Sequence, residues 1–464
     1  MPWRDLPGPI PMRRIAVVAP TRRWRRVLVA VADSGVVEPE EGGHPAGIDG
    51  WSPTAELVAA AGGPRLAPDP PDIVALRAAG RVELVAGEAE LERVSSCALH
   101  QDQITALAGW APADAIGQLA ERLAPLGGSV VEMPTPTGAD VPTALPPRRS
   151  AEALRPLVDT YATVPYRDVD PVWFATIAYV FMFGMMFGDV GDGLVLVVAA
   201  LLLRRTRRPR FARVRRVWPL VLALGAMATV FGLLYGEAFG PTGLVPTIWI
   251  APLDEPETLL LAGVGVGAVL LACAYAIGIV NRWREGGPGA ALWAPSGGAG
   301  AALFLGLALV VGGVVWSLPP LWAAGLVVGV IGLVLAAVGL RSQAGPGGAG
   351  VAQAGVETFD LALRIGSNVV SFARLAAFGL MHAAIAFVVW DATKSLWGSG
   401  TAAAVAALAV FAIGHVVAFA LEALVVGVQA LRLEYYELFS RIFVSEGRPF
   451  RPWHVPVIRE ETPC

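Results

Sequence analysis

Residues 356–392 decide the fold class, and they read VETFDLALRIGSNVVSFARLAAFGLMHAAIAFVVWDA. As one α-helix this stretch would be about 55 Å long at about 1.5 Å per residue. The hydrocarbon core of a bilayer is only about 30 Å thick. We therefore expect a membrane helix that tilts strongly or projects from the bilayer.

Polar side chains recur along this helix at helical spacing. Asp360, Arg364, Ser367, Ser371 and Arg374 follow one another at steps of four, three, four and three, which places them on one face. An ionisable residue in mid-span costs on the order of 3 kcal/mol and normally faces protein or water. The stripe is therefore a candidate polar path, although Asp360 and Arg364 are equally well read as an ordinary i,i+4 ion pair near the membrane boundary.

The composition agrees with a polytopic membrane protein. Of the 464 residues, 55% are hydrophobic and 16% are charged, and the net charge of −3 gives no basic field for nucleic acid. The three cysteines, Cys97, Cys273 and Cys464, have neither disulfide nor zinc-site spacing, and we predict no metal or cofactor. Lys394 is the only lysine and no phosphate-binding loop surrounds it, so we expect no nucleotide site in this chain.

The pattern of charges and apolar runs changes near residue 165 and predicts two domains. Residues 1–165 are expected to form a small cytoplasmic α/β domain, with strands at 14–20, 36–39 and 129–133 and helices at 22–32 and 115–126. Residues 166–464 are expected to form an α-helical membrane domain ending in two long tilted helices. We expect about eight spans, near 173–187, 191–204, 217–235, 258–281, 299–316, 320–340, 356–392 and 401–440.

The arginine-bearing loops indicate the orientation. Arginines cluster after the second span, Arg282 and Arg284 follow the fourth, and Arg341 follows the sixth. Loops 236–256 and 317–320 hold neither lysine nor arginine, and Lys394 is the one exception to this pattern. The positive-inside rule then places both termini in the cytoplasm, and we find no signal peptide. The abundance of Ala, Gly and Arg indicates a bacterial genome, so we expect the cell membrane as the location.

The eighth span carries a second polar stripe. His415, Glu422, Gln429 and Arg432 follow at steps of seven, seven and three and so share a face, while His382 lies farther along the seventh span. A lone histidine in a span is as often a packing residue as a proton relay. Two polar stripes on neighbouring helices suggest a path for ions.

Several motifs resemble the membrane domain of the V-type ATPase subunit a/I family. The segments are PYRDVDP at 165–171, FGMMFGDVGDG at 183–193, YGEAFG at 235–240, SFARL at 371–375, LRLE at 431–434 and EGRPF at 446–450. The resemblance covers about residues 165–454, and GWAP at 109–112 is similar to the cytoplasmic arm of that family.

The resemblance implies a stator subunit of a rotary ATPase. It implies that ATP hydrolysis or synthesis on another subunit is coupled to rotation of a proteolipid c/K ring, and that this chain passes protons between ring and water. Arg374 matches the essential arginine of the family, and Glu422, Gln429 and Arg432 match its second polar set. A histidine is common at the position of Gln429. The peripheral stalk, the central rotor subunits and membrane lipid would be the other partners.

The orientation assigns two half-channels under this resemblance. Asp360, Ser367 and Ser371 would lie on the cytoplasmic side of Arg374. The outer side would hold His382, His415 and Glu422, with Arg432 inward. Members of this family usually carry a long cytoplasmic coiled-coil arm. The arm looks shortened here, because no sustained heptad run is visible.

Two alternatives remain open at this stage. A stand-alone secondary transporter would need a substrate site between two related halves, and no such symmetry is visible. A non-conducting assembly scaffold would not need Arg374 or Glu422. The direction of operation and the choice of proton or sodium also stay open, because the ion-binding carboxylate would belong to the ring.

Overall fold

The computed structural model describes residues 8–40, 62–136, 138–146, 154–206, 208–397 and 400–458. The chain forms two compact units. We call Gly8–Pro146 with Gly447–Cys464 the sheet unit, and Pro147–Glu446 the helical unit.

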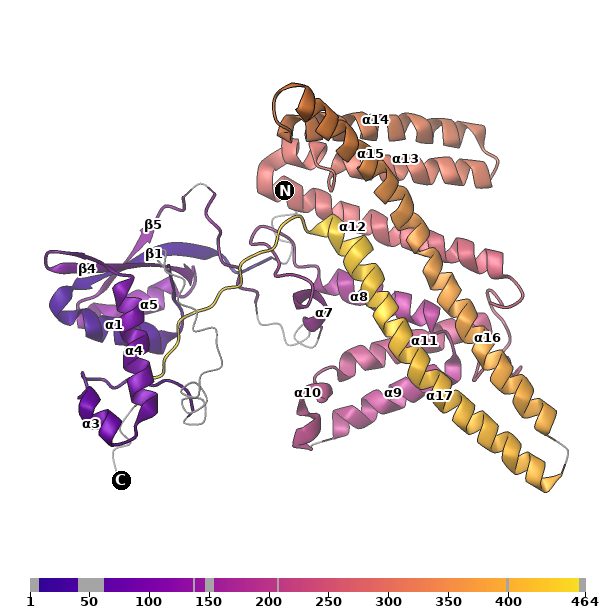
Figure 1. Cartoon of the computed structure of the whole chain (residues 1–464), viewed down its shortest axis with the longest axis horizontal. Helices are drawn as coiled ribbons and strands as arrows, with labels where there is room; N and C mark the ends of the chain where they lie inside the picture. The colour runs from indigo at the N-terminus through magenta and orange to yellow at the C-terminus, as the bar shows by residue number, and fades with distance from the viewer. Residues whose placement is uncertain are drawn as a thin grey trace. The chain divides into compact units, whose positions relative to one another are not determined.

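The sheet unit contains an antiparallel sheet with helices packed against it (Figure 1). The strands are β1 (Met12–Pro20), β2 (Glu38–Pro39), β3 (Leu99–Gln101), β4 (Ile104–Pro112) and β5 (Ser129–Met133), in the order β2-β4-β1-β5 with β3 also on β4. The helices are α1 (Trp24–Ser34), α3 (Ile73–Ala78), α4 (Val82–Ser96) and α5 (Ile116–Leu123), with short 3-10 turns at Thr21–Arg23 and Ala124–Leu126.

Alternation along β1 builds the core of this unit. Ile15, Val17 and Ala19 are buried because every second side chain of a strand points to the same face. They meet Leu28 of α1 and Leu107 of β4 in one apolar cluster. The predicted small α/β domain is therefore confirmed, while β3, β4, α3 and α4 were not anticipated.

The C-terminal segment Gly447–Ile458 is hydrogen-bonded into this unit. Thr143 N donates to Arg448 O at 2.7 Å, and Trp453 N donates to Val37 O at 2.8 Å. Farther along, Leu66 N donates to Pro456 O at 3.0 Å. Trp453 and Val455 are also buried in the apolar core of this unit, so the tail is a structural part of the sheet unit.

The helical unit is an assembly of long apolar helices (Figure 1). Among the described residues, six helical runs are long and apolar enough to cross a membrane. With the shorter α8 and α9 they confirm the polytopic helical class. The elements are α7 (Pro156–Asp159), α8 (Val172–Met186), α9 (Val190–Arg205), η4 (Pro209–Phe211), α10 (Ala212–Arg215), α11 (Trp218–Tyr235), α12 (Pro256–Trp293), α13 (Gly298–Val315), α14 (Pro319–Gln343), α15 (Gly347–Ser371), α16 (Ala373–Leu396), α17 (Thr401–Leu433), η5 (Glu434–Phe439) and α18 (Ser440–Ile442).

Three of these elements depart from the uniform helices expected. The long helix α12 is interrupted at Gly287, where φ is 74°, just before Pro288. The seventh predicted span begins earlier, at Gly347, and is divided between α15 and α16 at Phe372. The eighth ends in η5, a π-helical turn of six residues that shifts the register of the side chains after it.

Close packing explains the division at Phe372. Its side chain is fully buried, and a Cβ on Gly267 of α12 would overlap the Phe372 ring. Phe372 N donates to Val369 O at 3.2 Å and Leu375 N donates to Phe372 O at 2.9 Å, which are the tighter i+3 bonds of a 3-10 turn. The turn sets the direction in which α16 starts.

Candidate functional site

Arg374 is the second residue of α16 and follows this tight turn directly. Its side chain is half-buried, and its Nη1 atom is enclosed without a hydrogen bond to any described residue. The carboxyl group of Glu437 in η5 lies close enough to interact with the Arg374 charge and with the Ser371 hydroxyl. Arg374 therefore stands at the junction of α15, α16 and η5, with capacity for a further acceptor.

His382 and Glu422 form a buried pair between α16 and α17. His382 Nδ1 contacts Glu422 Oε2 directly, and each residue is only 3% exposed. His382 Nε2 and Glu422 Oε1 have no hydrogen-bond partner among the described residues. His382 follows Arg374 by eight residues, which is about 12 Å along a helix. Glu422 of the stripe on the eighth predicted span thus meets His382 of the seventh.

Asp189 is fully buried, and both of its oxygens accept backbone hydrogen bonds. As the N-cap of α9 it accepts from Gly191 N at 2.7 Å and Asp192 N at 3.1 Å. It also accepts from Phe239 N and Gly240 N at 2.9 Å each, in the loop after α11. One carboxylate thereby fastens this loop to the start of α9.

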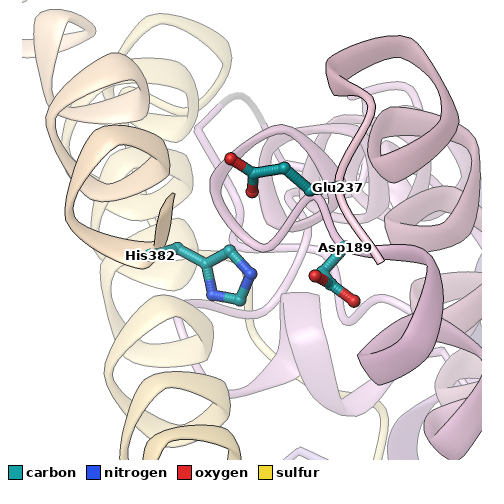
Figure 2. Close-up of side chains that lie close together, drawn as sticks. All are labelled: Asp189, Glu237 and His382. Atoms are coloured by element: carbon teal, nitrogen blue, oxygen red, sulfur yellow. The ribbon is translucent and has the colours of Figure 1, made fainter. Parts of the chain in front are cut away.

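This loop carries Glu237 to the His382 pair. Figure 2 shows the carboxylates of Asp189 and Glu237 beside the imidazole of His382, and their ligand atoms all lie within 4.8 Å of one another. Glu237 is 4% exposed and its Oε2 has no partner among the described residues. Histidine and carboxylates can hold a metal ion. Here four amide donors already occupy Asp189, so the arrangement suits a hydrogen-bonded network better than a metal centre.

His415 lies seven residues before Glu422, on the same face of α17, and is also buried. Its ring packs against Phe411 and Phe239, with centroids 4.5 Å and 5.4 Å away. His415 Nε2 and the Oε1 atom of Gln429, farther along α17, are enclosed without partners in the described part of the chain. The face of α17 that carries these side chains therefore holds unsatisfied polar atoms at two levels besides Glu422.

The remaining candidates lie at the surface. Asp360 and Arg364 form an exposed ion pair of 2.6 Å, with side chains 52% and 69% exposed. Such a pair contributes about 0.2–0.5 kcal/mol to an isolated helix. Ser367 is exposed, and the Ser371 hydroxyl donates to its carbonyl at 3.0 Å. Arg432 is also exposed, beside the start of η5.

Sequence reasoning did not assign several buried polar residues near these helices. Asp189, Asp192 and Glu237 stand in motifs that were quoted only for their resemblance, so the available signal was the acidic residue inside a Gly-rich turn. Two further residues, Glu434 and Glu437, are buried in η5. Their burial could not be read from the α-helical period, because the π-helical turn changes it.

A second buried charge cluster joins the segment before α8 to α12. Burial, together with the nearby Glu285 and against the opposing charge of Arg282, raises the pKa of Asp168 to about 8. The Arg282 guanidinium is 3.8 Å from Asp168. Asn281 accepts from Val169 N at 3.0 Å, so this cluster also fixes the chain that enters α8.

Known proteins resemble the chain over most of its length. The V-type ATPase 116 kDa subunit family matches residues 93–290. The A-type ATP synthase subunit I of Pyrococcus horikoshii is 26% identical over 392 residues, covering 80% of this chain and 57% of that protein. The subunit I of Archaeoglobus fulgidus is 28% identical over 404 residues, covering 75% and 58%.

A shorter match is closer in sequence. The V-type ATP synthase subunit I 2 of Treponema pallidum is 36% identical over 124 residues, covering 27% of this chain and 26% of that protein. The chain spans 57% and 58% of the length of the two archaeal relatives. Taken with the apolar helices and the motifs, these matches make the chain similar to the V-type ATPase subunit a/I family.

Proposed function

We propose that this chain is the membrane stator subunit of a rotary ATPase and translocates protons between two half-channels past a partner proteolipid ring. ATP hydrolysis or synthesis would take place on another subunit of the complex. Similarity to the V-type ATPase subunit a/I family supports the class of complex, and the buried polar groups of α16 and α17 support a conducting role. Both termini would lie in the cytoplasm, by the distribution of arginines in the loops.

The observation that carries the proposal is the state of Arg374. Its half-buried guanidinium has an enclosed nitrogen without a partner among the described residues, which is costly unless another chain supplies an acceptor. A carboxylate of the ring is such an acceptor. At about 4 Å and an effective dielectric near 20, the two charges attract by about 4 kcal/mol. That favours the ionised carboxylate by about 10³ and so drives its proton off.

The same charge keeps the two half-channels apart. A guanidinium stays protonated, so Arg374 cannot relay a proton and repels one that approaches. On the outer side we assign His382, Glu422 and Glu237 to the path, because they form one buried cluster. On the cytoplasmic side we assign Ser371 and Glu437. Proton transfer would then pass through the ring carboxylate.

The exposed side of α17 is where we place the ring. Only 11% of its most apolar 18-residue window is buried, against 28–39% in the other five runs. An apolar helix face left uncovered in the chain must meet lipid or another membrane protein. Glu422 lies on the covered side of α17. A ring packed against the exposed side of α17 would therefore be only one helix away from the cluster of Glu422, His382 and Glu237.

Co-purification tests this proposal. When the chain is expressed with a proteolipid that carries a mid-membrane carboxylate and extracted in a mild detergent, mass spectrometry should find the two together. Purified complexes in vesicles should conduct protons, whereas the chain alone should not. A chain that stays free of any ring and transports an ion or solute by itself would refute the stator assignment.

A further inference from the structure

A cavity of about 780 Å³ with polar and apolar lining lies in the helical unit, and neither His382 nor Glu422 lines it. Its walls come from α12 on both sides of the Gly287 break, from the segment before α13, from the end of α14 and from α18. Two arginines, Arg282 and Arg441, line it together with Ser296, Ser342 and Ser440. The cavity therefore combines two buried arginines and one carboxylate, that of Glu285, with hydroxyl groups.

The Arg282 guanidinium is only partly satisfied. Its side chain is 8% exposed, Nη1 contacts Glu285, and Nη2 is 3.8 Å from Asp168. Neither Nε nor Nη2 has a hydrogen-bond partner in the described ranges. Because five N–H donors fan out from a guanidinium, a second acceptor fits beside Glu285.

Arg441 is in the same condition. It is 8% exposed, lies over the Tyr275 ring at 5.7 Å, and donates from Nη2 to the Asn368 amide oxygen at 2.7 Å when that amide is oriented to satisfy both of its ends. Its Nε has no partner among the described residues. Arg441 thus also has a buried donor to spare.

Tight helix packing holds both arginines at this cavity. Gly278 lies one turn before Arg282 on α12, and a Cβ there would stand 2.6 Å from both the Arg441 and the Ser296 carbonyl oxygens. This contact presses α18 and the segment before α13 onto the face of α12 that carries Arg282. The three enclosed nitrogen atoms need acceptors, since buried polar groups are almost always hydrogen-bonded.

We propose that this cavity binds a phosphate group, carried by an anionic phospholipid headgroup or present as the free ion. Phosphate oxygens accept hydrogen bonds from two guanidinium groups at once. The apolar part of the lining, Trp293, Val338 and Phe443, offers a surface for acyl chains. A bound phosphate would join α12, α14 and α18 at the level of η5. This inference is independent of proton transport.

Binding can be measured on the purified full chain in dodecyl maltoside. We expect phosphatidylglycerol to raise the melting temperature saturably and phosphatidylcholine to leave it unchanged. Arg282→Gln and Arg441→Gln should each weaken the apparent affinity at least tenfold. Arg341→Gln is the matched control, because Arg341 is exposed near the end of α14, bonded to Gly345 O, and lies outside the cavity lining. It should bind as the wild type does.

A second pair of variants keeps both arginines. Ser342→Trp should fill the cavity and abolish the rise in melting temperature, whereas Ser342→Ala should preserve it, because Ser342 lines the cavity and is otherwise exposed. This pair decides the matter if the arginine variants fail to fold.

Inorganic phosphate distinguishes the two sources. A rise with phosphatidylglycerol alone assigns a lipid headgroup, a rise with inorganic phosphate alone assigns the free ion, and a rise with both assigns the shared group. The proposal is overturned if neither probe stabilises the chain, or if Ser342→Trp responds as strongly as the wild type.

Discussion

The His382–Glu422 pair predicts a large difference between two substitutions at one position. Glu422→Ala removes the partner of His382 Nδ1 where both residues are 3% exposed. Breaking a buried pair in this way costs about 3–5 kcal/mol. Glu422→Gln keeps the side-chain volume and an oxygen that can accept from Nδ1. It exchanges a charge-assisted hydrogen bond of about 1.5–3 kcal/mol for a neutral one of about 0.5–1.5 kcal/mol, so it should cost only about 1 kcal/mol.

A double-mutant cycle measures the pairing itself. The free energy of unfolding of the purified full chain can be followed in mixed detergent and SDS micelles. We expect Glu422→Ala and His382→Ala to be coupled by about 2 kcal/mol or more. His415→Ala, also buried but not bonded to Glu422, serves as the control and should be additive with Glu422→Ala within about 0.5 kcal/mol. Additivity between His382 and Glu422 would refute the reasoning.

Three further predictions concern other parts of the chain. The pKa of Asp168 is raised to about 8 in the folded chain. The protonated carboxyl group therefore contributes its full stability below about pH 4, and this contribution is lost as the pH rises towards 8. The melting temperature should fall over that pH range, and it should fall less in Asp168→Asn. An unchanged slope in the variant would contradict this. Gly267→Ala should destabilise the chain by about 1–3 kcal/mol, because the new Cβ would overlap Phe372. In the control Gly265→Ala, on the same helix, the new Cβ has nothing within 4 Å, so this variant should be neutral or stabilising. Equal melting temperatures of the two variants would show that Gly267 and Phe372 are not in close contact. Truncation after Glu446 removes the hydrogen-bonded tail of the sheet unit, so limited proteolysis should cleave that unit faster, and an unchanged rate would show that the tail is dispensable.

Much of the helical unit could be predicted from hydrophobicity and helix-breaking residues. The expected segment at 320–340 corresponds to Pro319–Gln343, and the segment at 217–235 to Trp218–Tyr235. Spans are readable because each must satisfy its own backbone hydrogen bonds in lipid. The division at Phe372 was not readable, since it depends on the absence of a side chain at Gly267 in another helix.

The sheet unit was harder to predict. Strand β5 coincides with the expected 129–133, but β4 escaped notice although it pairs along its whole length with β1. Sheet partners are distant in sequence, and strand propensity depends on that context. The tail was likewise invisible, because Trp453 N bonds to Val37 O across more than four hundred residues and has no local signature.

The sequence named candidate residues and not their contacts. Helical spacing placed His415 and Glu422 on one polar stripe, His382 lay farther along the seventh span, and all three are buried. Which residues would touch depends on the axial offset between α16 and α17, which tertiary packing sets. Asp189 was missed as a participant because its four backbone partners come from two separate segments, the first turn of α9 and the loop after α11.

The most direct test of the central claim is ATP-driven acidification of vesicles that contain the assembled complex, normalised to ring content. We predict that Arg374→Ala abolishes acidification without reducing membrane insertion, because removal of a mid-span charge eases insertion. Arg374→Lys should also be severely impaired, since a buried ammonium can lose its proton. The control Arg364→Ala breaks only an exposed ion pair and should retain acidification. Near-normal acidification by Arg374→Ala at normal assembly would contradict the account.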